Sequence, residues 1–318
     1  MAPSCTDDEF IALYRDLQSS SAVAKRLGIA TRNVQARKVR IENKYGVILP
    51  QFDTRPAYAK GAVSHGNAVY SLTVEDGVVL IGSDFHVWPG ERTTMQRAFI
   101  SFAAKLRPVA VIANGDVFDG ATVSRWPSIG WEHKPTVKQE LEAVGDFLGD
   151  VVKASGKAKR LWLLGNHDAR FESRIAANAP EFAGVKGVHL RDHFDQWIPA
   201  WRCDINDDVV VKHRGVGGEH ADWNNVVKSG KTFITGHDHR AGVVPYHDYT
   251  GVRWGVRCGY MAESPQASQF VNYLEASAPN WHPAFVVLTF HKGRLLWPEL
   301  VNRHEDGIVQ FRGELIKV

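Results

Sequence analysis

Five short motifs between residues 83 and 239 carry side chains that could bind metal ions. They are SDFH at 83–86, GDVFD at 115–119, GNHD at 165–168, the isolated His213, and GHDH at 236–239. Imidazole, carboxylate and carboxamide groups without any thiolate form a mixed nitrogen and oxygen ligand set, which suits Mn, Fe, Zn and similar ions. The motifs therefore predict a metal site built from histidine, aspartate and asparagine.

The number of candidate ligands indicates two ions rather than one. A single ion that also holds water cannot use seven protein ligands, whereas two ions that share a carboxylate can. Such pairs lie about 3.5–4 Å apart and hold both oxygens of an in-line phosphoryl displacement. For the fourth motif His220 is the alternative to His213, which we favour because His213 ends an apolar run. The seven candidates are Asp84, His86, Asp116, Asn166, His213, His237 and His239.

The apolar runs that precede the motifs predict the elements that position them. Each run except the last ends in Asp, Asn or His, and ligands of open α/β sheets bind beyond the carboxyl ends of the strands. We therefore expect an α/β domain over residues 76–318 whose motifs converge in one cleft. The predicted strands are 78–83, 109–114, 160–166, 209–213, 232–237 and 284–290, with helices at 93–106, 138–154 and 169–178.

The five motifs, in this order, resemble the calcineurin-like metallophosphoesterase family. The resemblance implies a four-layered α/β/β/α sandwich and two divalent ions, Mn first, with Fe, Zn or Ni as alternatives. It implies hydrolysis by a metal-bridging hydroxide, with His167 as the general acid and Asp168 orienting its imidazole or hydrogen-bonding behind the ligands. By the same resemblance Asp84, His86 and His239 would hold one ion and Asn166, His213 and His237 the other, with Asp116 bridging.

Three polar residues next to the motifs have less specific expectations. Asp119, at the end of GDVFD, is expected to cap the following turn or to lie behind the ligands. Arg170 and Arg174 follow GNHD one helical turn apart and could meet phosphates, although surface positions are favoured.

Residues 1–48 form a separate unit in the sequence. The first 60 residues carry ten Lys or Arg against six Asp or Glu, and the other 258 carry 28 against 29. Three short helices are expected, at 8–17, at 22–27 after a serine break, and at 31–45 with Thr31 as its cap. This pattern resembles the helix-turn-helix of bacterial and phage DNA-binding proteins, in which the last helix enters the major groove. The predicted DNA contacts are Arg32, Arg37, Lys38, Arg40 and Lys44.

The basic unit also has a plainer interpretation, as a helical cap for dimerisation or docking whose charges are only solvated. Residues 49–75, punctuated by proline and glycine, are expected to connect it to the larger domain. The stretches RCGYMAESP at 257–265 and NWHPAFVVLTF at 280–290 look like phosphoesterases of phages and prophages, some of which carry an N-terminal helix-turn-helix.

Composition limits the remaining choices. The chain of 318 residues is 44% hydrophobic and has no apolar run near the length of a membrane span, no basic head with an apolar stretch, and three scattered cysteines. We expect a cytoplasmic protein, in the host cytoplasm if a phage encodes it. Three functions stay open: a phosphodiesterase or nuclease acting on DNA or another nucleic acid, a hydrolase of small phosphoesters such as cyclic nucleotides, and a non-catalytic DNA-binding regulator. The intact motifs disfavour the last of these.

Overall fold

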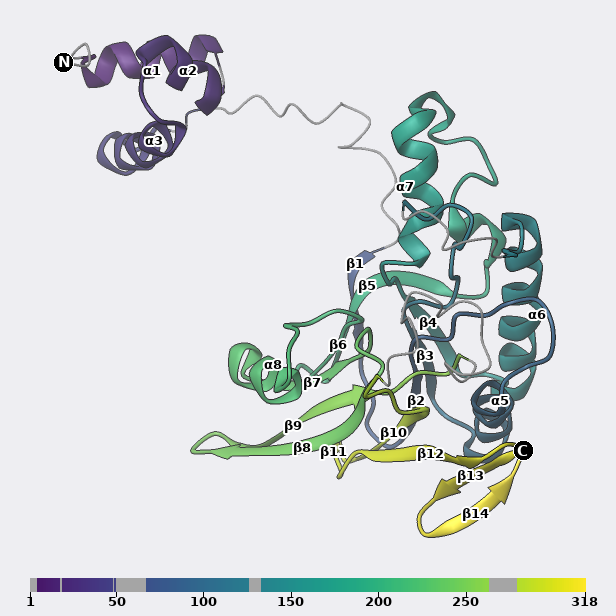
Figure 1. Ribbon diagram of the computed structural model, residues 1–318. Helices are drawn as coiled ribbons and strands as arrows, with labels where there is room; N and C mark the ends of the chain where they lie inside the picture. Colours follow the sequence, from purple (N-terminus) through teal and green to yellow (C-terminus); the bar gives the residue numbers. More distant parts are fainter. Residues whose placement is uncertain (1–4, 18, 48, 50–66, 126–132, 263–278) are drawn as a thin grey trace. The chain divides into compact units, whose positions relative to one another are not determined.

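The computed structural model describes residues 5–17, 19–47, 49, 67–125, 133–262 and 279–318 (Figure 1). The chain divides into two compact units, Met1–Ala62 and Val63–Val318. Within the described ranges, no helix has both the length and the apolar character that crossing a bilayer requires.

The smaller unit contains three helices, α1 (Asp7–Leu17), α2 (Ser20–Leu27) and α3 (Thr31–Tyr45). The Ser19 hydroxyl caps α2 by accepting a hydrogen bond from the Ala22 amide, and the left-handed Gly28 ends it. The N-cap of α3 is Ala30, without a side-chain cap, so Thr31 is not the cap that the sequence predicts. The three helices pack around a small core that includes Phe10, Tyr14, Val23, Val34 and Ile41.

The larger unit is built on a sheet whose central strands lie where the apolar runs predict them. The strand order is β14-β13-β12-β10-β2-β3-β4-β5-β6-β7-β9-β8. Strands β2 to β5 are parallel neighbours, as are β6, β7 and β9, while β10 runs antiparallel to β2. The predicted strands correspond to β2 (Gly77–Gly82), β3 (Ala110–Asn114), β4 (Lys159–Leu163), β6 (Val209–Val211), β7 (Thr232–Thr235) and β10 (Ala284–His291).

Several elements have no counterpart among the predictions. Strand β1 lies within residues 49–75, where a connector is expected, and pairs in parallel with β5. The larger unit also contains helix α8 (Ala221–Ser229) and the short 3-10 helices Pro180–Phe182 and Leu190–His193. The other strands without a prediction are β1 (Asn67–Leu72), β5 (Ile198–Ile205), β8 (Ala241–Asp248), β9 (Gly251–Cys258), β11 (Arg294–Leu295), β12 (Glu299–Glu305), β13 (Ile308–Phe311) and β14 (Glu314–Lys317).

Two hydrophobic clusters show that the sheet folds into the expected layers. Along β2, Leu80 belongs to the cluster that contains helices α5 (Thr94–Leu106) and α6 (Val137–Ser155). Its neighbours Val79 and Ile81 belong to a second cluster, which includes Ile234 of β7 and Val256 of β9. The second cluster therefore lies between two halves of the sheet. Figure 1 shows α5 and α6 on one side of the strands and α8 on the other, which gives the four-layered α/β fold.

Candidate metal centre

The turns after the central strands hold their polar residues in an unusual backbone conformation. Asp84 and His86 follow β2, Asp116 follows β3, and His237 and His239 follow β7. All five have positive φ angles, of 53°, 38°, 53°, 75° and 59° respectively. Non-glycine residues rarely adopt this left-handed conformation, and strain of this kind concentrates at functional sites. The turns are also tied together, because the Asp84 amide donates to the Gly115 carbonyl at 3.0 Å.

Glycines let the motif turns approach one another closely. A Cβ atom added at Gly165 would overlap the Asp116 carboxylate, and one added at Gly236 would overlap Ser83 and Asp84. The glycines of GNHD and GHDH are therefore needed because a neighbouring motif occupies the space of their missing side chains.

The structure brings six of the seven predicted ligands into two clusters. Asp84, His86 and His239 form one, and Asp116, His213 and His237 form the other, and within each the candidate ligand atoms lie within 4.8 Å of one another. The first cluster contains the three residues predicted to hold one ion. The second contains His213 and His237 of the other predicted set, together with Asp116, the predicted bridge. A third group of the same kind joins Asp116 to His86 and His167, so that Asp116 lies between the two sets.

Asn166, the seventh predicted ligand, lies next to Asp116. The amide of the following residue, His167, donates a hydrogen bond to Asp116 Oδ1 at 2.8 Å. The Asn166 Oδ1 atom is buried, and no described residue donates a hydrogen bond to it. A buried carbonyl oxygen without a donor is costly unless a cation or water meets it, so Asn166 fits the role of a ligand.

Two histidines are held in the orientation that metal ligands need. The Nδ1 atom of His86 lies 2.9 Å from Asp119 Oδ1, and that of His213 lies 2.8 Å from the Asn114 carbonyl oxygen. Each oxygen accepts the Nδ1 proton, which leaves the Nε2 lone pair available for an ion. The His213 Nε2 atom lies 3.1 Å from Asp116 Oδ2. His220 is instead at the start of α8 and lines a different pocket, so the structure places His213 and not its alternative in the cluster.

The carboxylates of the cluster stay ionised. Burial opposes their charge, but the neighbouring imidazoles lower the pKa of Asp84 to about 2 and hold the pKa of Asp116 well below its usual range. Burial lowers the pKa of His86, which favours the neutral imidazole that can bind metal. The ionised carboxylates, the neutral imidazole of His86 and the Asn166 oxygen, to which no described residue donates, together fit a pair of divalent cations.

His167 is oriented by Asp119. Its Nδ1 atom lies 2.7 Å from Asp119 Oδ1, the same oxygen that accepts from His86. Burial opposes the imidazolium form, yet Asp116 and Asp119 raise the pKa of His167 above its ordinary value. Asp119 therefore lies behind the predicted ligands, the second of its two expected positions, and its contact with His167 is what the sequence analysis did not predict. Its position as the last residue of GDVFD, three after Asp116, was the available signal.

Asp168 does not take the orienting role expected of it. Its two oxygens accept hydrogen bonds from the indole N–H of Trp162 and from four backbone amides, those of residues 116, 117, 118 and 165. Since no described contact joins its carboxylate to the His167 ring, Asp168 fixes the loop that carries Asp116. This corresponds to the second of its two predicted roles.

Arg170 reaches the site rather than the surface. Its Nη2 atom lies 3.0 Å from His167 Nε2, and its Nη1 donates to the Asp119 carbonyl at 3.0 Å. The guanidinium thus lies beside the ring nitrogen that would exchange a proton with a substrate. The expected surface position of Arg170 is wrong, because Asp119 draws its side chain inward.

The predicted DNA contacts on α3 are partly neutralised within the smaller unit. Arg37, Arg40 and Lys44 all form ion pairs with Asp7 of α1. Arg37 and Lys38 are also half-buried, so they are less accessible to DNA than the other three predicted contacts, which are exposed. Lys38 pairs with Glu42, and among the described residues only Arg32 of the five makes no ion pair.

Two phage proteins are similar to this chain over most of their length. The chain is 26% identical to the Gene 54 protein of Mycobacterium phage L5 over 247 residues and 25% identical to that of phage D29 over 243 residues. Each match covers 70% of this chain and 92% of the relative.

Three solved structures are similar at low sequence identity. Vps29 of Entamoeba histolytica complexed with Zn²⁺ is 14% identical, with a TM-score of 0.39, and the match covers 76% of this chain and 98% of that one. The E. coli phosphoesterase YfcE is 10% identical, with a TM-score of 0.34 and coverages of 75% and 96%. A serine/threonine phosphatase of Saccharomyces cerevisiae is 13% identical, with a TM-score of 0.37 and coverages of 86% and 96%.

The family match covers all five motifs described above. The sequence profile named Calcineurin-like phosphoesterase matches residues 77–253, a range that contains all seven predicted ligands together with His167 and Asp119. The protein therefore belongs to the calcineurin-like phosphoesterase family and is a metal-dependent hydrolase of phosphoric esters.

Proposed function

We propose that the protein hydrolyses phosphodiester bonds of DNA or another nucleic acid. The observation that carries the proposal is the convergence of two His/Asp clusters on Asp116, beside the paired His167 and Asp119. Such a pair of clusters suits two divalent ions, and we propose that both are Mn²⁺. When bound, the two ions lower the pKa of a water and offset charge on the phosphoryl oxygens.

The protein side chains supply the proton transfer. Asp116 and Asp119 raise the pKa of His167 and so favour its imidazolium form, which carries a proton on each ring nitrogen. Asp119 accepts from Nδ1, so the Nε2 proton is the one that His167 gives to the departing alkoxide, and the neutral ring remains. Arg170, 3.0 Å from that nitrogen, is positioned to meet a phosphoryl oxygen of the substrate. When Arg170 donates to a phosphoryl oxygen instead, His167 Nε2 no longer accepts its hydrogen bond and can carry a proton.

The smaller unit is the reason to propose a nucleic acid substrate. The pairing of α2 with the basic α3, across a turn that begins at the left-handed Gly28, suits a domain that binds in the DNA major groove. Phosphates would then compete with Asp7 for Arg37, Arg40 and Lys44, which makes binding sensitive to salt. We place this activity in the cytoplasm, that of the host if a phage carries the gene.

A second candidate is a hydrolase of small phosphoesters, in which the helices serve only for localisation. It is favoured by the pairing of three α3 cations with a single carboxylate, which leaves fewer charges for a polymer.

The test is hydrolysis with Mn²⁺ of a chromogenic phosphodiester, a chromogenic phosphomonoester, and linear and circular DNA, single- and double-stranded. His167→Ala should lower kcat by about 10²–10⁴-fold while the protein still binds metal. The exposed His304→Ala is the matched control and should leave kcat unchanged. DNA cleavage lost in His167→Ala supports the nuclease proposal, whereas turnover of small esters with intact DNA would replace it by the second candidate.

A further inference from the structure

A second pocket opens directly beside the fifth motif. It has a volume of about 500 Å³ and is lined by residues of α8, of β8 and β9, and of the segment before β10. Arg240, in its wall, follows the predicted ligand His239, and the amide of His282, also in its wall, donates to the His239 carbonyl at 2.8 Å. The wall of the pocket therefore begins one residue along the chain from a predicted metal ligand, which makes the pocket a candidate site for the organic part of a phosphoester.

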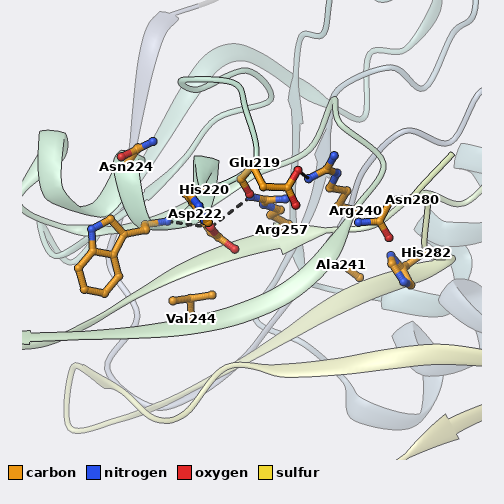
Figure 2. A pocket seen from close by; sticks show the side chains of 11 residues that line it. Glu219, His220, Asp222, Asn224, Arg240, Ala241, Val244, Arg257, Asn280 and His282 are labelled. Carbon is orange, nitrogen blue, oxygen red and sulfur yellow. Dashed lines mark hydrogen bonds and ion pairs between the residues drawn. The ribbon is translucent and has the colours of Figure 1, made fainter.

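The charged groups of this pocket are paired with one another. Arg240 lies 3.0 Å from Glu219, and the buried Arg257 lies 3.2 Å from Asp222 and 3.4 Å from Asp238. Figure 2 shows Glu219, Asp222 and Arg257 in the middle of the pocket. Arg240, Asn280 and His282 lie towards one end and Asn224 towards the other. Because carboxylates already form ion pairs with both arginines, the pocket suits a neutral ligand better than a second phosphate.

The remaining lining groups suit a flat ring with polar edges. The indole of Trp223 is 45% exposed, and the ring of Tyr246 lies edge-on to it at 4.8 Å, which limits its rotation. Val244 adds an apolar side chain, while the amide of Asn280 and the imidazole of His282 can each donate or accept hydrogen bonds. Stacking on an aromatic ring, combined with hydrogen bonds from amide and imidazole side chains, is how proteins bind nucleobases.

We propose that this pocket binds one nucleoside, the group esterified to the phosphate that reacts at the metal centre, with its base against Trp223. The proposal rests on the proposed hydrolysis of phosphodiesters. The nucleoside could belong to a free nucleotide ester or to the end of a DNA strand, since both present the same base, sugar and linking phosphate. A volume near 500 Å³ holds one nucleoside and lies within the usual range of small-molecule sites.

The test compares three phosphodiesters that share p-nitrophenol as the leaving group. The second group on the phosphate is thymidine in one diester, 2-deoxyribose without a base in another, and methyl in the third. Trp223→Ala should raise KM for the thymidine ester at least tenfold and change kcat/KM for the other two by less than twofold. Trp223→Phe should restore most of the affinity. The exposed Trp297→Ala, away from the pocket, is the control and should change none of these values. An equal effect of Trp223→Ala on all three esters, or no effect, would overturn the proposal.

Direct binding separates this inference from the proposed function. Thymidine binding by calorimetry, weakened by Trp223→Ala, would uphold the pocket even if wild type hydrolysed no diester, and that result would refute only the proposed function. Turnover of the diesters without thymidine binding or selectivity would refute the pocket and leave the function standing. Linear and circular single-stranded DNA of one sequence then show whether the bound nucleoside belongs to a strand end or to a free nucleotide ester. Sensitivity to Trp223→Ala on the linear strand alone indicates a strand end, whereas sensitivity on the thymidine ester alone indicates a free nucleotide.

Discussion

Asp119 and Asp168 are both buried carboxylates of the metal-site loops, and their partners give them different roles. Asp119 accepts from the side chains of His86 and His167 through one oxygen. Asp168 accepts mainly from backbone amides. The adjacency of Asp168 to His167 in GNHD suggests the opposite assignment. The side-chain directions at the start of α7 (Asp168–Asn178) decide it, and these depend on tertiary packing.

The Asp119→Asn variant should lower kcat by about 10–100-fold and weaken metal binding by about tenfold, because a neutral amide orients His86 and His167 less firmly. Asp119 raises the pKa of His167, so its loss should lower that pKa. Activity that needs protonated His167 should then decline at a lower pH than in wild type. The kcat–pH profiles and metal stoichiometries of Asp119→Asn and of the exposed control Asp195→Asn test this prediction. An unshifted profile in Asp119→Asn would remove Asp119 from the positioning role.

At the scale of elements, the sequence predicts the strands that are buried on both faces and misses those that are not. Continuous apolar runs such as VVLIG and AVIAN identify β2 and β3. Strands β8 and β12 are partly exposed and mix polar with apolar residues, so their sequences lack that signal. The convergence of the motifs follows from sheet topology, and it was predictable. The left-handed turns at five predicted ligands were not, because histidine and aspartate carry no strong signal for that conformation.

The close contact between the turns after β3 and β4 makes Gly165 a sensitive position. Gly165→Ala should displace Asp116 and lower kcat/KM at least tenfold, because the added methyl overlaps the carboxylate that lies between the two clusters. Gly149→Ala, inside α6 with open space around it, is the matched control. It should leave activity intact and stabilise the fold by up to about 1 kcal/mol. Metal stoichiometry, kcat/KM and urea unfolding distinguish the two, and full activity in Gly165→Ala would contradict the contact.

Helix α6 is joined to the loop after β3 by a buried carboxylate. Glu140 accepts hydrogen bonds from the Gly120 and Ala121 amides at 2.7 and 3.0 Å, and burial together with the nearby Asp119 raises its pKa from 4.5 to about 7. Between these pH values the unfolded chain releases this proton before the folded chain does. Stability should therefore fall as pH rises from about 4.5 to 7, by at most about 3 kcal/mol from this group.

Urea midpoints of the chelated protein at pH 5 and pH 7 measure this dependence. Wild type should lose more stability across the interval than Glu140→Gln. Glu142→Gln, exposed on the same helix, should behave as wild type. Equal losses in wild type and Glu140→Gln would show that Glu140 does not titrate in this range.

At the scale of the whole molecule, the two compact units have different proposed roles: the smaller unit binds DNA and the larger unit hydrolyses the ester. Deleting residues 1–48 should leave hydrolysis of methyl p-nitrophenyl phosphate within about twofold of wild type and abolish salt-sensitive retention on DNA. In the intact chain, Arg32→Ala should reduce the salt dependence of DNA binding by about one phosphate contact. The exposed Lys105→Ala, in the larger unit, is the control. Equal DNA affinity with and without residues 1–48 would overturn this division.

The order of the clustered residues along the chain constrains when the site can form during synthesis. Asp84, His86 and His239 belong to one cluster, and Asp116, His213 and His237 of the other fall between them. During synthesis on the ribosome, His237 completes the second cluster. His239, two residues later, completes the first cluster, although Asp84 and His86 of that cluster are made earliest. A nascent chain that has not emerged beyond β7 lacks the full set of either cluster. Both metal sites therefore become available together, after the strands from β2 to β7 have been made, and a chain truncated before that point holds neither.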